Sequence, residues 1–318
     1  MRRTLEGLIT ALVAVVVLII LVRLLPGDPL AEILGDRAAD PAQRALLEHQ
    51  WGIDRTIVQS VAGFFAGIPR GDLGISLSEQ RPVTAVLAEH LPPTLLLGSL
   101  TLIVDFTVGL ALGVWSALHP DTVRARIIAA FTLIGYALPS FVVGTLLTWI
   151  FAVNLGWLQT GGMSDVLLAG DASSSAILID RLKHLVLPLT AMVVATIAIP
   201  LRQQRTAALV SAAQPWVLAA RARGVSPAAI AWRHCWRPAL TPIVTLFGLW
   251  LPMLVAGSVF VEYVFSWPGM GLVLAHATAS RDFPLVIGAG LVLIVVVQLG
   301  SIGADLLYHV VDPVQRAP

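Results

Sequence analysis

The chain has 318 residues and a net charge of +1; 57% of its residues are hydrophobic and only 12% are charged, with a mean hydropathy of +0.85. A soluble domain of this length needs far more polar surface to cover its core, so the composition excludes that class and indicates a membrane protein. The one cysteine, Cys235, excludes an internal disulfide and a multi-cysteine metal site, and the seven histidines show no metal-ligand spacing.

Six apolar stretches are long enough, at about 1.5 Å per residue, to cross a hydrocarbon core roughly 30 Å thick. We therefore expect an all-α polytopic membrane protein with about six transmembrane helices. The fourth stretch is the shortest and contains Pro188 and Pro200. The stretches lie near residues 5–25, 94–118, 127–153, 184–201, 238–264 and 283–311.

The first stretch resembles a secretory signal peptide, because Arg2 and Arg3 precede a long apolar run. The run is too long for a signal-peptide core and no small-residue cleavage site follows, so we expect an uncleaved anchor. The sequence thus divides into an N-terminal membrane anchor (1–25), a large extracytoplasmic loop or subdomain (26–93) and a transmembrane core (94–318).

Arginine placement predicts the orientation, since cytoplasmic loops near a membrane carry the excess of lysine and arginine. If the spans alternate, most arginines fall on one side, and both termini are cytoplasmic. Arg181 and Lys183 fall on the other side, in a loop that also holds Asp165, Asp171 and Asp180. The arginines on the cytoplasmic side are Arg2, Arg3, Arg124, Arg126, Arg202, Arg205, Arg221, Arg223, Arg233 and Arg237.

The two long outer segments are more than simple turns. In the first, residues 57–65 place apolar side chains at helical spacing, which predicts an amphipathic helix. Such a helix lies on the membrane face, docks on a partner, or packs on the chain's own bundle, and the pattern leaves these alternatives open. In the second segment, Gly161-Gly162 and the tract 171–175 predict loop. The apolar residues of the predicted helix are Ile57, Val58, Val61, Phe64 and Phe65.

A single acidic residue, Asp105, lies at the middle of the second predicted span. A charged aspartate at the bilayer centre costs about 2.5–3.5 kcal/mol on insertion scales. We therefore expect Asp105 to be protonated, to face water in a translocation path or a subunit interface, or to bond to polar groups. The groups considered are Tyr136, Ser140, Gln298 and Ser301, or a partner chain. Tyr136 and Ser140 join Asp105 as candidate path residues.

Two prolines predict discontinuities within spans: Pro139 in the third and Pro252 in the fifth. A proline in a membrane helix can act as a functional bend, or it can be tolerated because neighbours satisfy the freed backbone groups.

The lysine content excludes nucleotide binding of the P-loop type by this chain. That motif needs Gly-x-x-x-x-Gly-Lys-Ser/Thr, and the only lysine, Lys183, is followed by His184. If the protein takes part in ATP-driven work, another chain must bind the ATP and Mg²⁺, and no cofactor is expected here.

The segment 214–243 predicts a protruding helical hairpin on the cytoplasmic side. Residues 216–223 are good helix formers, and Gly224 can adopt the positive φ that ends a helix. Ser226 and Pro227 then fit the N-cap and first position of a second helix. The small Ala219 and Ala220 would let another protein approach closely. The alternative is an ordinary basic loop that interacts with anionic lipid headgroups.

At this point the chain resembles a known family. Ala219-Ala220-x-x-x-Gly224 is similar to the coupling-loop motif of binding-protein-dependent ABC importer permeases. The stretch 261–286 (VEYVFSWPGMGLVLAHATASRDFPLV) and the terminal 305–313 resemble the dipeptide, oligopeptide and nickel permeases. The segments 23–29, 51–60, 71–77 (GDLGISL) and 91–95 (LPPTL) resemble the B-type subunit of that family, and the resemblance covers nearly the whole chain.

The resemblance implies a non-enzymatic permease subunit in a bacterial cytoplasmic membrane, which forms half of a translocation path. Its partners would be a homologous C-type permease, two cytoplasmic ATPases that hydrolyse ATP, an extracytoplasmic solute-binding protein and the lipid bilayer, with no nucleic acid. Closure of the ATPases would move the coupling loops and swing the attached helices as rigid bodies. Within a coupling loop at 214–237, the residues expected to meet an ATPase are Leu218, Ala219, Ala220, Arg221, Arg223 and Gly224.

One position departs from the family motif: Leu218 stands where other permease families have glutamate. Peptide permeases commonly lack that acid, so the departure bears on a salt bridge and not on docking. Within the family, peptides are the expected substrate, with nickel chelates or glutathione-like solutes as alternatives.

Two other classes of protein fit the sequence less well. An ion-coupled secondary transporter would show several intramembrane ionisable residues and inverted repeats. An intramembrane enzyme would show paired aspartates, HExxH or Gly-x-Ser-x-Gly within a span. We find neither pattern in the sequence and predict no catalytic or metal site.

Overall fold

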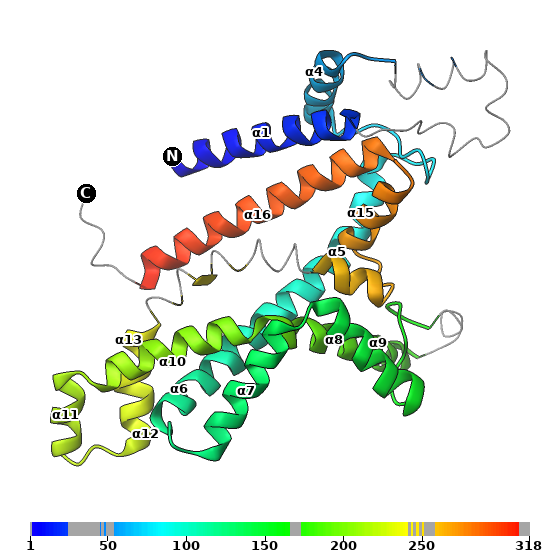
Figure 1. Ribbon diagram of the computed structural model, residues 1–318. Helices are drawn as coiled ribbons and strands as arrows, with labels where there is room; N and C mark the ends of the chain where they lie inside the picture. Colours follow the sequence, from blue (N-terminus) through cyan, green and yellow to red (C-terminus); the bar gives the residue numbers. More distant parts are fainter. Residues whose placement is uncertain are drawn as a thin grey trace. The chain divides into compact units, whose positions relative to one another are not determined.

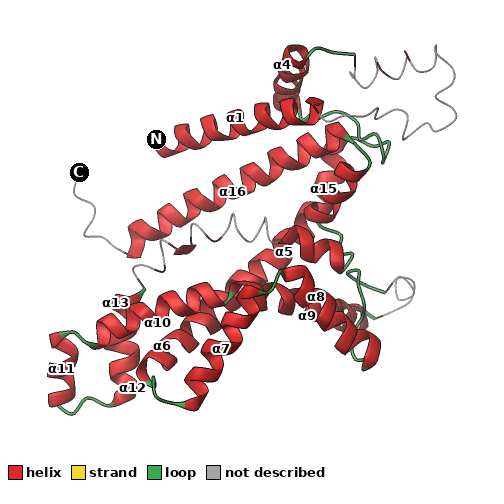
Figure 2. Cartoon of the chain, viewed as in Figure 1, coloured by secondary structure: helices red, strands yellow, loops and turns green. Residues whose placement is uncertain are grey.

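The computed structural model describes residues 2–24, 45, 48, 54–165, 173–240, 243, 246–247, 250 and 258–311. All regular elements in these ranges are helices (Figures 1 and 2), and the strand-like pairing among them is one isolated antiparallel bridge between Ile75 and Pro82. Pro252, Asp171 and about half of the predicted fifth span lie outside the described residues.

The chain divides into two compact units. The first comprises Met1–Thr94 and Pro268–Leu299, and the second comprises Leu95–Trp267 and Gly300–Pro318.

The first unit contains α1 (Arg2–Leu24), α4 (Ile57–Gly67), the start of α5 (Val83–Val104), α15 (Met270–Ala279) and most of α16 (Phe283–Val311). The predicted amphipathic helix is confirmed as α4. It begins at a capping box, in which the Thr56 side chain accepts from the Gln59 N–H and the Gln59 side chain accepts from the Thr56 N–H.

The core of this unit is a cluster of aliphatic side chains from α1, α5, α15 and α16. Its fully buried members are Val22, Val83, Val86, Leu87, Met270, Val273, Ala277, Leu285, Val286 and Ala289.

The second unit contains the rest of α5, a π-helical turn at Asp105–Gly109, and α6 (Leu110–Leu118). Next come α7 (Val123–Ala137), α8 (Ser140–Leu147), a π-helical segment at Thr148–Asn154, α9 (Ser174–Thr196) and α10 (Ala198–Ala212). Lys183 is exposed on α9.

In this unit α6 packs closely against α10. A Cβ atom at Gly113 would lie 2.6 Å from the Leu201 carbonyl oxygen, so a larger residue cannot be placed there without a shift of backbone. Small residues at helix contacts are typical of membrane bundles, where lipid supplies no hydrophobic force between helices.

Four of the predicted spans correspond to long helical segments. Val83–Leu118 and Phe283–Gly303 are each long and apolar enough to cross a membrane. Val123–Ala137 with Ser140–Asn154, and Ser174–Thr196 with Ala198–Ala212, qualify only as bent pairs, with bends of 107° and 45°. The second span was predicted from residue 94, yet its helix begins at Val83, because a helix can continue beyond the apolar stretch that crosses the lipid.

The predicted discontinuity at Pro139 is confirmed. Leu138 and Pro139 leave the helical region (ψ 135° and 138°), and this break separates α7 from α8. The residue before a proline is disfavoured in helical conformation, which explains why the chain turns at this point.

Candidate functional site

The predicted helical hairpin is present in the second unit. Its first helix is α11 (Pro215–Ala222), and its second runs through α12 (Pro227–Ala229), a π-helical turn (Ile230–Cys235) and α13 (Trp236–Ala239). Gly224 has a φ of +77°, and its N–H donates to the Arg221 carbonyl at 2.9 Å. The Ser226 hydroxyl accepts from the Ala229 N–H, as an N-cap does.

The predicted coupling residues fall on two faces of α11. Leu218, Ala219 and Arg221 are exposed, and Arg223 and Gly224 are exposed at the turn. Ala220 is fully buried, as is Val217, and α11 packs on the second helix of the hairpin. Ala219 and Ala220 were both predicted to lie on the exposed surface that meets an ATPase. Adjacent helix positions differ in direction by about 100°, so only Ala219 faces outward.

The hairpin carries positive charge without a compensating acid in its own sequence. No aspartate or glutamate occurs between Asp180 and Glu262, whereas Arg221, Arg223 and Arg233 are all exposed on this hairpin. The Cys235 thiol is buried inside it, and burial raises the pKa of that thiol while nearby Arg221 opposes the shift. The exposed surface therefore favours an acidic partner surface.

A hollow of about 640 Å³ lies between this hairpin and α6. Trp115 and Trp232 line it together with Arg221, and the Trp115 indole stacks on the His119 ring with centroids 5.1 Å apart. The hairpin thus projects from α6 with an apolar recess at its base.

Asp105 is the second candidate. Its side chain is fully buried, at the first residue of the π-helical turn that interrupts the long helix Val83–Leu118. The Trp250 indole N–H donates to Asp105 Oδ2 at 3.2 Å, and Thr196 also interacts with the carboxyl group. Asp105 Oδ1 has no hydrogen-bond partner among the residues that the structure describes.

The partner of Asp105 was not among the groups that the sequence analysis considered. Tyr136 is 46% exposed near the end of α7 and Ser140 begins α8, and neither makes a hydrogen bond to Asp105. The two residues flank the break at Pro139 instead. Nothing in the local sequence of Asp105 could have identified Trp250, which lies 145 residues away.

A third group of polar residues was missed as a site, although its segments had been singled out as family motifs. In the first unit, Asp282 is fully buried, and its Oδ2 accepts from the Ser76 hydroxyl (2.5 Å), the Ser78 N–H (2.9 Å) and the Ser78 hydroxyl (2.8 Å). Its Oδ1 accepts from the Leu285 N–H at 3.2 Å and so caps the start of α16.

A similar link joins two other motif segments in the same unit. The Met270 N–H, at the start of α15, donates to the Thr94 hydroxyl at 2.7 Å. We call Ser76, Ser78, Thr94, Met270 and Asp282 the signature cluster. Hydrogen bonds to side chains thus join segments of the first unit that lie far apart in the sequence.

Within the described ranges, no three His, Cys, Asp or Glu side chains come together as metal ligands do. The described residues present instead a basic, exposed helical hairpin, a buried carboxyl group and a polar cluster that joins distant segments.

Residues 109–317 match the family described as "Binding-protein-dependent transport system inner membrane component". The chain belongs to this family of importer permeases. The matched range includes Gly113 and the whole hairpin 215–239. Family membership and the apolar helices together make the chain a multi-pass membrane protein.

Curated relatives of this permease match over almost their whole length. The di/tripeptide transport system permease protein DppB of Pseudomonas aeruginosa is 33% identical, over 92% of this chain and 91% of the relative. The oligopeptide transport system permease protein AppB of Bacillus subtilis is 31% identical (98% and 97%). The glutathione transport system permease protein GsiC of Pectobacterium atrosepticum is 33% identical (99% and 97%).

Among solved structures, the inward-facing MetNI methionine ABC transporter has a similar fold. The TM-score is 0.54 at 18% identity, over 71% of this permease and 96% of that chain. At this identity the likeness concerns the fold alone.

Proposed function

We propose that this chain is one of two permease subunits of an ABC importer for short peptides, and that it lines half of the translocation path. The similarity of nearly the whole chain to di/tripeptide and oligopeptide permeases supports the substrate class. The glutathione permease relative favours a second candidate, a glutathione-like solute, which is itself a small peptide.

The observation that carries the proposal is the basic hairpin, with α11 as the coupling helix. Leu218, Ala219 and Arg221 face outward, and Gly224 forms the turn beside them. Two partner ATPases bind and hydrolyse ATP, and one of them receives α11 in a surface groove. Ala220 holds the hairpin together from inside and does not touch the ATPase.

The topology we propose has six spans, both termini in the cytoplasm, and residues 26–93 outside. The α11 hairpin and Arg124 and Arg126, which begin α7, then share the inner side. A homologous permease completes the path, and a solute-binding protein delivers the substrate from outside. Asp105, Tyr136 and Ser140 are the residues we propose for the path or its gating.

The test is reconstitution of the four-subunit importer in vesicles, with measurement of binding-protein-stimulated ATP hydrolysis and of uptake. Ala219→Arg places a bulky charge on the docking face and is expected to lower both rates at least about tenfold, a loss of roughly 1.4 kcal/mol or more of coupling. Ala228→Arg adds the same side chain at an exposed position of α12 and is the matched control.

A second substitution tests the turn itself. Gly224→Val forces a β-branched residue into positive φ and is expected to uncouple ATP hydrolysis from uptake. Normal uptake by both Ala219→Arg and Gly224→Val, at normal expression, would show that α11 is not the coupling helix. ATP turnover by the pure permease alone would contradict the proposal that partner ATPases, and not this chain, hydrolyse ATP.

The substrate is identified by mass spectrometry of the ligand that co-purifies with the cognate binding protein. A short peptide or glutathione supports the proposal, and a nickel chelate or a non-peptide solute overturns the substrate class.

A further inference from the structure

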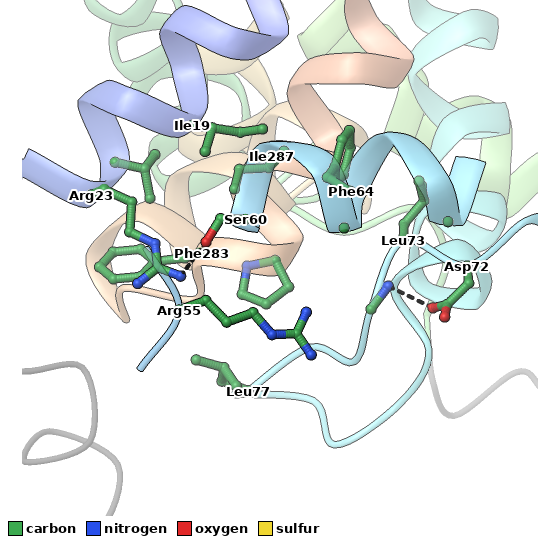
Figure 3. Close-up of a pocket in the computed structure, with 15 residues that line it drawn as sticks. Ile19, Arg23, Arg55, Ser60, Phe64, Asp72, Leu73, Leu77, Phe283 and Ile287 are labelled. Atoms are coloured by element: carbon green, nitrogen blue, oxygen red, sulfur yellow. Dashed lines mark hydrogen bonds between the residues drawn. The ribbon is translucent and has the colours of Figure 1, made fainter. Parts of the chain in front are cut away.

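A pocket in the first unit lies beside the end of α1 and the start of α16. It has a volume of about 200 Å³ and is walled by Ile19 and Val22 of α1, Phe64 of α4, and Phe283 and Ile287 of α16 (Figure 3). α16 enters its candidate span at Phe283, and the apolar part of α1, Ile9–Leu24, ends beside it. The pocket therefore lies near the membrane–water interface, where phospholipid headgroups are found.

Two guanidinium groups reach this pocket from different elements. Arg23, near the end of α1, donates from Nη2 to the Ser60 hydroxyl of α4 at 2.6 Å, which fixes its direction. Arg55 also lines the pocket, close enough to Arg23 for the two charges to interact, and makes no hydrogen bond or ion pair with another described residue.

The acidic residues that the structure describes near this pocket leave room for an added anion. Asp54 interacts electrostatically with Arg23 but does not line the pocket. Asp72 lines it at the far end, where its Oδ1 accepts from the Gly74 N–H at 2.9 Å, as the dashed line in Figure 3 shows. Among the described residues, Arg55 is thus the charge at this pocket that a bound anion would satisfy.

The outer surface of α4 favours lipid as the source of that anion. No side chain of α4 is buried, and its apolar residues Ile57 (39%) and Val58 (77%), two and three positions after Arg55, are exposed. An exposed apolar helix face next to the end of a span is typical of a helix that lies in the membrane interface. A soluble acidic peptide would account for the arginines but not for this apolar face.

We propose that this pocket binds the phosphate group of a phospholipid, with the guanidinium groups of Arg23 and Arg55 as ligands and the face of α4 resting on the same leaflet. Guanidinium groups form paired, charge-assisted hydrogen bonds to phosphate oxygens, and the apolar wall accommodates the glycerol end of the acyl chains. The inference rests on the proposed function only in one respect: the topology proposed there, with residues 26–93 outside, makes this leaflet the outer one.

The experiment measures lipid retention and not transport. The permease is purified within the importer complex, exchanged into nanodiscs of phosphatidylethanolamine with phosphatidylglycerol, stripped with detergent and analysed by native mass spectrometry. Arg55→Gln is expected to lower phosphatidylglycerol affinity about tenfold, equivalent to about 1.4 kcal/mol. Arg55→Lys should retain part of the affinity, because it keeps the charge but loses the paired donors.

Arg70→Gln is the matched control, since Arg70 is exposed at the end of the helical turn after α4 and does not line the pocket. Equal lipid retention by the wild type, Arg55→Gln and Arg70→Gln would overturn the proposal. So would normal lipid retention with weakened binding of the solute-binding protein, which would assign the pocket to a protein carboxylate. Normal uptake by Ala219→Arg together with reduced lipid retention by Arg55→Gln would contradict the proposed function and still support this lipid site.

Discussion

Two buried aspartates, one in each unit, have opposite surroundings. Asp282 receives four hydrogen bonds, from Ser76, Ser78 and the Leu285 N–H. Among the described residues, Asp105 accepts one hydrogen bond, from the Trp250 indole N–H, and its Oδ1 has no hydrogen-bond partner. Both side chains are 0% exposed, so burial alone does not distinguish them.

We interpret the difference as that between a structural role for Asp282 and the proposed role of Asp105 in transport. A buried carboxyl group whose acceptors are filled fixes the segments that donate to it, as Asp282 joins the loop at residues 76–78 to the start of α16. A partly satisfied buried carboxyl group costs free energy, and one within a membrane span is by default a functional hypothesis. The predictions below test this contrast through stability and uptake.

The largest effect is expected at Asp282. Asp282→Ala leaves the donors of Ser76 and Ser78 unsatisfied and removes the cap of α16, which should lower the free energy of unfolding by about 3–4 kcal/mol. Denaturant unfolding in detergent measures it. Asp72→Ala is the control, because Asp72 is exposed and accepts one backbone hydrogen bond. An equal loss of stability in Asp72→Ala would contradict the claim that the buried hydrogen bonds of Asp282 cause the effect.

A smaller loss is expected when one donor of the same cluster is removed. Ser76→Ala deletes a buried hydroxyl that donates to a carboxylate and should cost about 1.5–3 kcal/mol. The same unfolding assay applies, with Ser99→Ala as the control, since Ser99 is exposed and donates only to the Leu96 carbonyl. No loss at Ser76 would mean that Ser78 alone holds Asp282.

At Asp105, substitution is expected to change the free energy of unfolding little but to lower uptake strongly. Replacing both partners by apolar residues, in Asp105→Leu with Trp250→Phe, should change the free energy of unfolding by less than about 1 kcal/mol, because no donor or acceptor is left unpaired. Uptake in reconstituted vesicles should nevertheless fall at least about tenfold. Full uptake by a stable double variant would show that Asp105 is not needed for transport.

The smallest effect on stability is expected for Asp105→Asn. The amide oxygen can still accept from the Trp250 indole N–H, so assembly and the unfolding midpoint should be retained. Uptake kinetics then report on the charge. An unchanged apparent substrate constant indicates a neutral carboxyl group, and a raised constant indicates an ionised one that contacts a cationic group of the substrate. Dissociation of the complex would contradict a role confined to transport.

The features that the sequence predicted correctly are those set by neighbouring residues. The turn at Gly224, the cap at Ser226 and the break at Pro139 each depend on local backbone preferences. The helix at 57–67 follows from a repeating apolar pattern in the same way. Such signals need no knowledge of the rest of the fold.

The features that the sequence did not predict depend on packing between distant segments. Ser76 and Asp282 are 206 residues apart, and Asp105 and Trp250 are 145 apart, so no spacing rule could pair them. The inward orientation of Ala220 depends on the second helix of the hairpin. The family resemblance marked several of these segments as important but did not say that they bond to one another.

The exposed side chain of Lys183 on α9 allows the orientation of the chain in the membrane to be measured by chemical labelling. Since it is the only lysine, an amine-selective reagent can modify one side chain and the N-terminal amine. In the topology proposed, a reagent that does not cross the membrane would label Lys183 from outside intact cells and spare the N-terminus. Inside-out vesicles would reverse the pattern. One labelling reaction therefore determines on which side of the membrane Lys183 and the N-terminus lie, without any engineered tag.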